Sequence, residues 1–112
     1  MIDSHNQTTN PIHASVVFDQ IDVLELLLKL TKPETITAKN DSGKTALHLA
    51  AFMNPDAIPI LLNTGLFSVM ERDDSGRTPV ATFAKFHPIL SYRFNLIKTF
   101  NLKSEEELIE SF

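Results

Sequence analysis

A stretch that occurs twice at a fixed spacing constrains the fold more than any other feature. The segment DSGKTALHLAAF begins at position 41, and the segment DSGRTPVATFAKF begins at position 74. Gly43 recurs as Gly76, 33 positions later (76 − 43), and Thr45 recurs as Thr78 at the same spacing. Such self-similarity indicates a chain built from stacked copies of one supersecondary unit, in which each copy buries its apolar face against its neighbours.

A third and weaker copy, NPIHASVVF, begins at position 10. Its His13 stands where the second copy has His48, at an offset of 35 (48 − 13). These segments resemble ankyrin repeats, whose period is about 33 residues and whose signature T-P-L-H-x-A opens the first helix of a helix pair. The second copy reads TALHLA from Thr45, so only Ala46 departs from the signature, in place of proline. The resemblance extends over roughly residues 8–100.

The resemblance implies an all-α fold, an ankyrin-repeat solenoid of about three helix-turn-helix units with a short C-terminal capping helix. We expect one ankyrin-repeat domain over residues 1–112, with repeats at approximately 8–38, 39–71 and 72–100 and a capping helix at 104–112. A chain of 112 residues, 43% of them hydrophobic, is long and apolar enough for one continuous core.

Apolar runs follow each copy at the distance expected for the second helix of the pair. The runs are Ile21, Val23, Leu24, Leu26, Leu27 and Leu28; Ile58, Ile60, Leu61 and Leu62; and Leu90, Phe94, Leu96 and Ile97. They are apolar on more than one face, as expected of helices packed between their own partners and the neighbouring repeats. We expect the second of these helices to begin near Asp56, which puts Pro59 in its first turn. His87 and Pro88 are expected to form the turn between the helices of the third repeat.

The C-terminal segment SEEELIESF has the pattern of a short helix. Ser104 and Glu107 form a capping box, and the helix is expected over residues 105–111. Because so short a helix does not persist alone in water, it needs to dock on the end of the stack. Three apolar side chains are expected to dock: Leu108, Ile109 and Phe112. The alternative is that this helix opens a further segment of a longer chain.

The resemblance also implies a structural role for the threonine and histidine of the repeated motif. In ankyrin repeats these residues form hydrogen bonds that tie the first helix to the adjoining loop and the next repeat. The resemblance assigns this role to His13, Thr45, His48 and Thr78. A buried imidazole needs partners for both ring nitrogens, which loop backbone supplies without any catalytic purpose. The copy that begins at position 74 has Ala81 at the histidine position, as expected of a terminal unit.

No residue pattern typical of catalysis or of metal binding occurs in the sequence. The chain has no cysteine, and its four histidines lie far apart: His5, His13, His48 and His87. The acidic residues at 73–74 and 105–107 are expected to be solvated charges at a loop tip and at a helix start. The segment at 43–45 lacks the upstream glycine of a phosphate-binding loop. We therefore expect no enzyme activity, no metal and no cofactor.

Charge and hydropathy indicate the kind of partner. The net charge is −4 and no basic stripe is present, so we expect no binding to nucleic acid. The longest apolar stretch, residues 21–30, contains charged residues and is too short to span a membrane. The N-terminus resembles no secretory signal, so matches to the glycosylation pattern at Asn6 and Asn40 are expected to be coincidental. The expectation is a soluble, cytoplasmic monomer whose partner is another protein.

Aligning the copies predicts an apolar surface along the first helices, because Val17-Phe18, Phe52-Met53 and Lys85-Phe86 fall in register. In the family these positions commonly face the binding groove, and charged loop tips border it. The expected partner-binding residues are Val17, Phe18, Lys39, Asp41, Lys44, Phe52, Met53, Arg72, Asp74, Arg77 and Phe86. The alternative is that the apolar members fold under the loop tips and complete the core.

The predicted function is that of a non-catalytic protein–protein interaction module, acting through the concave face of the stack. The glutamates of SEEELIESF are also similar to export signals of effectors that intracellular bacteria inject into host cells, which would place the protein in the host cytosol. Helix capping is the plain explanation for the same residues. Two further alternatives are a regulatory or targeting segment of a larger enzyme and an enzyme inhibitor.

Overall fold

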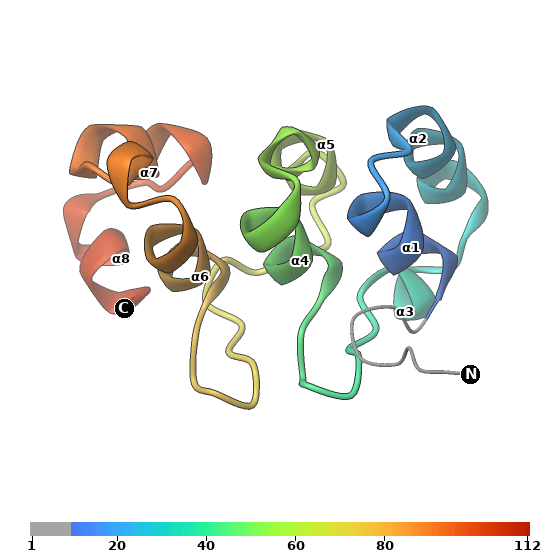
Figure 1. Cartoon of the computed structure of the whole chain (residues 1–112), viewed down its shortest axis with the longest axis horizontal. Coiled ribbons are helices and arrows are strands. Elements are labelled where there is room, and N and C mark those ends of the chain that lie inside the picture. Colours follow the sequence, from blue (N-terminus) through green and yellow to red (C-terminus); the bar gives the residue numbers. More distant parts are fainter. Residues whose placement is uncertain (1–9) are drawn as a thin grey trace.

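The computed structural model describes residues 10–112, and every regular element in that range is helical. Three helix pairs stand side by side along the longest dimension of the molecule, 39 Å (Figure 1). The all-α stack of helix-turn-helix units expected from the sequence is therefore confirmed. Residues 8 and 9 of the predicted first repeat, and His5 and Asn6, lie outside the described residues.

Each pair consists of a first helix next to the loops and a second helix on the side away from the loops, above the first in Figure 1. The first helices are α1 (Pro11–Val17), α4 (Ala46–Met53) and α6 (Pro79–Phe86). The second helices are α2 (Ile21–Leu30), α5 (Ile58–Leu62) after the 3-10 turn η2 (Pro55–Ala57), and α7 (Arg93–Thr99) after the 3-10 turn η3 (Pro88–Leu90). The remaining helices are α3 (Pro33–Ile36) and α8 (Glu105–Glu110). Helix α4 packs between α1 and α6 and so forms the centre of the stack.

The first helices begin where the sequence supplies an N-cap. The side-chain oxygens of Asn10, Thr45 and Thr78 each accept a hydrogen bond from the amide three residues later, at 3.0 to 3.4 Å. These bonds satisfy amides that have no partner inside the helix. Pro11 and Pro79 stand at the first helical position, where a missing amide hydrogen costs nothing.

The turns inside the second and third pairs are shaped by proline. Pro59 lies in the first turn of α5, as expected, and the chain enters that helix through η2, which begins at Pro55. His87 ends α6 and Pro88 opens η3, so this pair does form the turn between the helices. The proline rings block helical continuation of the residue before them, which separates the two helices of each pair.

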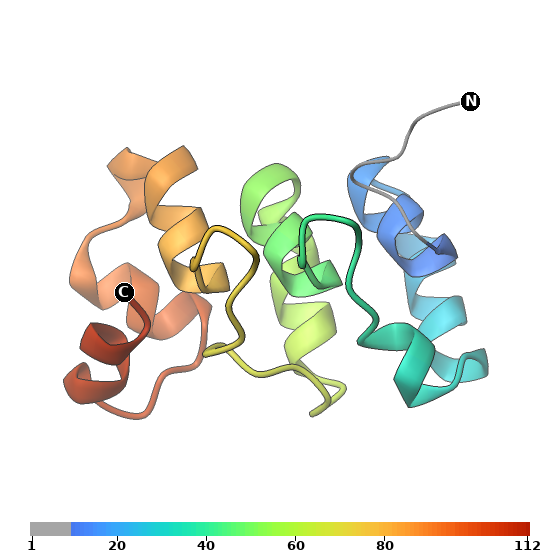
Figure 2. The ribbon, with the colours of Figure 1, turned by 90° about the horizontal axis from the view of Figure 1, so that it is seen from below.

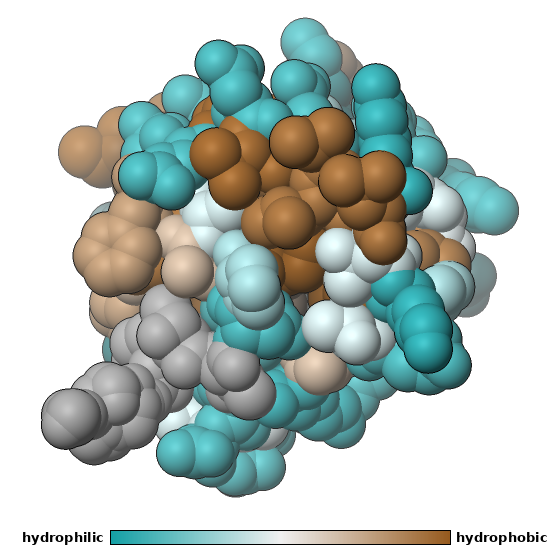
Figure 3. Space-filling model, turned by 90° about the vertical axis from the view of Figure 1, so that its right-hand side faces the viewer, coloured by the Kyte–Doolittle hydropathy of each residue, from teal (hydrophilic) through white to brown (hydrophobic). Residues whose placement is uncertain are grey.

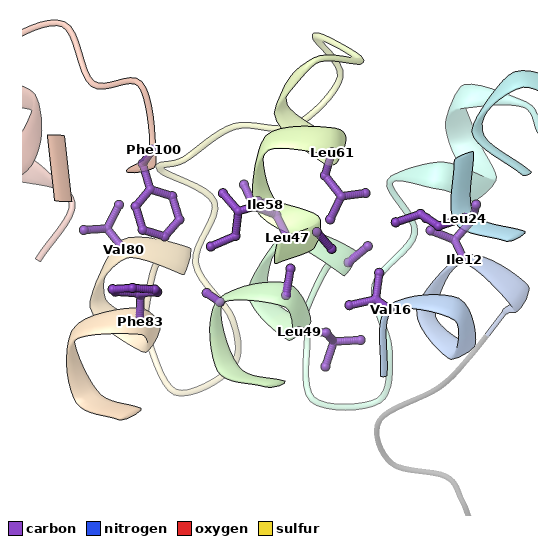
Figure 4. Close-up of a cluster of buried hydrophobic side chains, with 14 of the residues drawn as sticks. Ile12, Val16, Leu24, Leu47, Leu49, Ile58, Leu61, Val80, Phe83 and Phe100 are labelled. Atoms are coloured by element: carbon purple, nitrogen blue, oxygen red, sulfur yellow. The ribbon is translucent and has the colours of Figure 1, made fainter. Parts of the chain in front are cut away.

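One apolar core runs through all three pairs (Figure 4). Its labelled members are Ile12, Val16, Leu24, Leu47, Leu49, Ile58, Leu61, Val80, Phe83 and Phe100. Full burial of such a side chain contributes about 1.5–3 kcal/mol relative to exposure. Because these side chains lie between neighbouring pairs, the pairs stabilise one another.

The second helices at the ends of the stack are more exposed than the sequence pattern predicts. Helix α2 buries Leu24 alone, and Leu26 and Leu30 face solvent. In the third pair Phe94 is exposed, and half-exposed Leu90 belongs to η3 instead of the helix. The expectation of helices enclosed on several sides was wrong here, because a terminal pair has a neighbouring pair on one side only.

Helix α8 covers the end of the stack, but through a different set of residues than predicted. Leu108 is buried, whereas Ile109 and Phe112 are exposed. The fully buried Ser111 docks instead, and its carbonyl accepts a hydrogen bond from the hydroxyl of Thr78. The prediction for Ile109 and Phe112 was wrong because the helix contacts the stack along one narrow face. Its capping also differs from the predicted capping box, since the Glu107 carboxylate accepts a hydrogen bond from the amide of Lys103 at 2.7 Å.

Helix α3 has no counterpart in the predicted repeat. It is a single turn that begins at Pro33 and buries Ile36 in the core. The side-chain amide of Asn10 donates to the carbonyl of Thr35 at 3.0 Å, which ties this turn to the start of α1. A tertiary hydrogen bond therefore stabilises a helix too short to form independently.

Thr82 in α6 carries a buried hydroxyl whose effect on stability can be tested by substitution. Its side chain is buried, and its hydroxyl has no hydrogen-bond partner among residues 10–112. We expect Thr82→Val to raise the free energy of unfolding by about 1 kcal/mol, because an unsatisfied buried hydroxyl is replaced by a methyl group of similar size.

Thr78→Val is the matched control, measured in the same urea titration. The Thr78 hydroxyl accepts from Ala81 and donates to Ser111, so this variant should lose about 1–2 kcal/mol. Loss of stability in both variants would contradict the conclusion that the buried Thr82 hydroxyl has no hydrogen-bond partner among residues 10–112.

Candidate functional site

Asn40 and Asp73 organise two loops in the same way. The side-chain oxygen of each accepts the amides two and four positions later, at 2.9 and 3.0 Å in both loops. The backbone closes each loop through bonds from Asn40 to Lys44 and from Asp73 to Arg77, both 2.9 Å. A polar side chain that holds the turn therefore sets the shape of each tip, at the position just before the repeated DSG sequence.

The two loop tips lie against each other (Figure 2). The amide of Asp74 donates to the carbonyl of Ser42 at 3.0 Å, and the ammonium of Lys44 lies 3.1 Å from the carboxylate of Asp73. Gly43 is buried at this contact with φ at +74°. A Cβ atom there would lie 2.4 Å from Oδ1 of Asp74, so only glycine allows this approach.

The hydrogen-bond and ion-pair partners of Asp73 keep its carboxylate charged despite burial. Its side chain is almost fully buried. Burial by itself would raise the pKa of Asp73, yet the amide of Arg77 and the ammonium of Lys44 bring that pKa below its usual range. The expectation that Asp73 is a solvated charge was therefore wrong, because its carboxylate is buried and bonded to Lys44 and to loop amides.

The imidazole of His48 connects the second repeat to the third. Nδ1 lies 3.2 Å from the amide nitrogen and 3.1 Å from the hydroxyl oxygen of Thr45, and Nε2 lies 2.9 Å from the carbonyl oxygen of Arg77. Because a carbonyl only accepts, Nε2 carries the proton and Nδ1 accepts from Thr45. The neutral ring therefore satisfies both nitrogens, and protonation of Nδ1 would leave the Thr45 amide facing another donor.

Burial lowers the pKa of His48 below its usual value, although the hydrogen bond to the Arg77 carbonyl acts in the opposite direction. The side chain is fully buried. His13 has an equivalent position, with Nε2 2.9 Å from the carbonyl of Ala38, and burial lowers the pKa of His13 as well. Both rings thus reach the loop that leads into the next repeat.

At the terminal repeat, α8 replaces the missing loop of a fourth unit. Ala81 stands where the histidine would be, and the hydroxyl of Thr78 contacts the Ser111 carbonyl. The guanidinium of Arg72 donates to the carbonyl of Gly76 at 2.7 Å and to that of Glu110 at 3.1 Å. The first helix of the third pair is therefore braced by carbonyls at the end of α8.

A second set of contacts between repeats, at the far ends of the first helices, was not predicted from the sequence. Asn54 ends α4, and its amide donates to the carbonyl of Val16 at 3.2 Å. His87 ends α6, and its Nε2 lies 3.3 Å from the carbonyl of Phe52. Both residues precede a proline and are 33 positions apart (87 − 54), a recurrence that could have revealed them.

The charged residues predicted to bind a partner divide into two groups. Three have contacts within the chain: Lys39 with Glu71 at 2.7 Å, Lys44 with Asp73, and Arg72 with the backbone. The other three are Asp41, Asp74 and Arg77, for which no side-chain ion pair occurs among residues 10–112. Only this second group offers unpaired charge at the loop tips.

The apolar residues predicted to bind a partner lie at the C-terminal ends of the first helices. Phe18, Met53 and Phe86 are 68%, 45% and 43% exposed. Val17 and Phe52 are partly buried beside them, and the rings of Phe52 and Phe86 approach to 4.3 Å between centroids. These five residues lie at corresponding positions at the ends of three neighbouring first helices, and we name them the apolar ladder.

The described part of the chain contains no group of three or more histidine, aspartate or glutamate side chains that could hold a metal ion. Within residues 10–112, no helix combines the length and the apolar character needed to cross a bilayer. The polar residues of the site have backbone and side-chain partners that explain their placement.

Stacked helix pairs with histidine-braced loops define a helical-repeat solenoid. A family model described as ankyrin repeats, in three copies, matches residues 1–69, which is more than half of the chain. The chain belongs to the ankyrin repeat family, whose members are generally protein–protein interaction modules and typically non-catalytic. No curated protein matches the sequence at a significant level. Helices α6, α7 and α8 follow the matched segment and continue the stack.

Gly43→Ala tests the contact between the loop tips. Both Gly43 and Gly76 have positive φ, +74° and +81°, so alanine is strained at either position, at about 1–3 kcal/mol. A Cβ atom at Gly76 meets nothing within 4 Å, whereas one at Gly43 collides with Asp74. We expect Gly43→Ala to destabilise the protein more than Gly76→Ala does, by at least about 1 kcal/mol in thermal or urea unfolding. Equal losses would contradict a tight contact between the tips.

The buried histidines predict that stability falls in weak acid. Their pKa values are lowered in the folded state, so the unfolded chain binds protons first as the pH falls below about 6.5. The stabilisation is complete above that pH and is lost toward the lower pKa values of the folded state. The loss due to Asp73, whose pKa is also lowered, begins only below about pH 3.8.

Urea midpoints at about pH 7.5 and about pH 5 test this expectation. The double variant His13→Gln, His48→Gln should be less stable at the higher pH but lose less on acidification than the native chain. An unchanged pH dependence in the double variant would show that other groups cause the acid sensitivity.

Proposed function

We propose that this ankyrin stack binds a partner protein through the apolar ladder and through the loop tips at the opposite ends of the first helices. The observation that carries the proposal is the exposure of large apolar side chains at one position in three successive first helices: Phe18, Met53 and Phe86. Contiguous exposed apolar surface of this kind is typical of an interface. Aromatic and methionine side chains are also enriched in the energetically dominant centres of interfaces.

Exposure also argues against a purely structural role for the ladder. A side chain that completes the core would be buried, as Phe83 is one turn before Phe86 in the same helix, against the rings of His87 and Phe100. Phe52 is the intermediate case, because it packs against Phe86 and supports its position. A partner that covers Phe18, Met53 and Phe86 would therefore bury apolar area that folding leaves exposed.

The loop tips, at the N-terminal ends of the first helices, add charge within reach of a partner that spans these helices. Asp41, Asp74 and Arg77 have no side-chain ion pair among residues 10–112. Charges at the edge of an interface influence partner choice and association rate more than affinity. A regulatory segment or an enzyme inhibitor would use the same surface, with an enzyme as the partner.

The glutamates of α8 have local contacts that support capping more than an export signal. Ser104 accepts the amide of Glu107 at 3.2 Å, and Glu105 lies 3.4 Å from the guanidinium of Arg93. Acidic residues in the first turn of a helix interact favourably with its dipole. The proposed function therefore rests on the ladder and not on secretion.

Glutamate substitutions at the ladder test the proposed function. We expect Phe18→Glu and Met53→Glu each to weaken partner binding at least tenfold, about 1.4 kcal/mol, because a charge then lies at the centre of an apolar contact. Proteins retained by the immobilised chain are quantified by mass spectrometry, and folding is checked by circular dichroism.

Phe94→Glu is the matched control, since Phe94 is an equally exposed aromatic residue on α7, away from the ladder. It should retain the partners of the native chain. Equal retention by the ladder variants and the native chain would exclude the ladder as the binding surface.

A further inference from the structure

The end of the stack formed by the first helix pair carries an apolar patch (Figure 3). Three side chains of α2 account for it, with Val23 45%, Leu26 56% and Leu30 73% exposed. Residues spaced by three, four and seven positions lie on one face of a helix, so these side chains and half-buried Leu27 form a continuous strip. We name this strip the α2 face.

Equivalent positions in the next repeat show what the α2 face resembles. Leu24 and Ile58 are both fully buried and hold matching places in α2 and α5, at an offset of 34 (58 − 24). At that offset Leu27 matches Leu61, which is fully buried and points from α5 toward the first pair (Figure 4). Val23 likewise matches the fully buried Ala57, whereas Leu26 and Leu30 match the partly buried Ile60 and Thr64. Two positions of the α2 face, Val23 and Leu27, therefore correspond to a surface that receives another helix pair.

The two ends of the stack differ in whether a helix of the chain covers them. At the far end, α8 covers the third pair and contributes Leu108 and Ser111 to the contact. Terminal repeats of a soluble solenoid normally have a polar outer face, because no further repeat covers them. The α2 face departs from that rule, with three exposed apolar side chains on a ten-residue helix.

The charges that border the α2 face are complementary to a second copy of the same face. Asp22 and Lys29 are both exposed and lie seven residues apart, so they are on the same flank of the helix, about 10.5 Å apart along its axis. Neither forms an ion pair with another side chain among residues 10–112. If two such helices pair in opposite directions about an axis near Leu26, each Asp22 is opposite the other copy's Lys29.

We propose that two copies of this chain associate through their α2 faces, with the two α2 helices antiparallel about a two-fold axis. A two-fold interface requires a self-complementary surface. The α2 face is self-complementary in both its apolar strip and its flanking charges. This goes beyond the proposed partner binding and replaces the monomer expected from the sequence. The paired stacks would carry two apolar ladders, so a partner with two binding sites would gain avidity.

The interface centres on one ten-residue helix from each copy, which makes it small. We therefore expect reversible dimerisation that depends on protein concentration, measured by sedimentation equilibrium on the full chain. Leu26→Glu should raise the dissociation constant at least tenfold, because it places two charges at the two-fold axis. Ile109→Glu, at an exposed isoleucine of α8, should leave the dissociation constant unchanged.

Charge reversal tests the antiparallel arrangement separately from the apolar contact. Asp22→Lys alone and Lys29→Asp alone each create two like-charge pairs in the dimer, so each should weaken it about tenfold. The double variant Asp22→Lys, Lys29→Asp restores opposite charges at both positions and should recover dimerisation. Raised salt should reduce the difference between the single and double variants.

Disulfide trapping gives an independent readout, because the native chain has no cysteine. Leu26→Cys should form a covalent dimer under mild oxidation, and Ile109→Cys should not. A chain that stays monomeric up to millimolar concentration would overturn the proposal, whether residues 1–9 or another protein covers the face. A dimer that persists in Leu26→Glu would overturn the site, and failure of the double charge variant to recover dimerisation would overturn the antiparallel arrangement. None of these results depends on the apolar ladder.

Discussion

The stack depends on the contact between a buried imidazole and a loop carbonyl of the following repeat. His48 accepts from Thr45 in its own helix and donates to Arg77 in the next loop, so one side chain holds a helix start and an inter-repeat contact together. The arrangement requires a neutral ring, which burial favours. His13 and Ala38 repeat the contact one unit earlier. Because the loops are held in this way, Gly43 can lie directly against Asp74.

The contacts between repeats also account for the difference between the two ends of the stack. In the third repeat there is no histidine, and Thr78 instead donates to the Ser111 carbonyl of α8, which takes the place of a further loop. In the first repeat, His13 contacts the carbonyl of Ala38 in the loop that leads to the second repeat. Its second helix, α2, keeps an apolar face toward solvent. One end is therefore covered by α8, while α2 at the other end keeps three exposed apolar side chains.

The surface proposed to bind a partner follows from how the first helices are held. Their N-terminal ends are fixed by the loops and their C-terminal ends by Asn54 and His87, which reach back to carbonyls of the preceding first helix. The backbone positions of Phe18, Met53 and Phe86 are thus determined at both ends of each helix. A rigidly presented apolar strip loses little conformational entropy on binding, which favours affinity.

The sequence alone determined the repeat period and the proline-defined turns, because these depend on local backbone chemistry, and its resemblance to ankyrin repeats indicated the all-α class. It also indicated the positions of the apolar ladder. Only the tertiary structure decided which apolar residues remain exposed, so Ile109 and Leu26 face solvent although their pattern predicts burial. The helix α3, the back-reaching contacts of Asn54 and His87 and the docking of Ser111 were likewise decided there. Each of these depends on which residue from a distant part of the chain lies opposite, and hydropathy patterns carry no information about that neighbour.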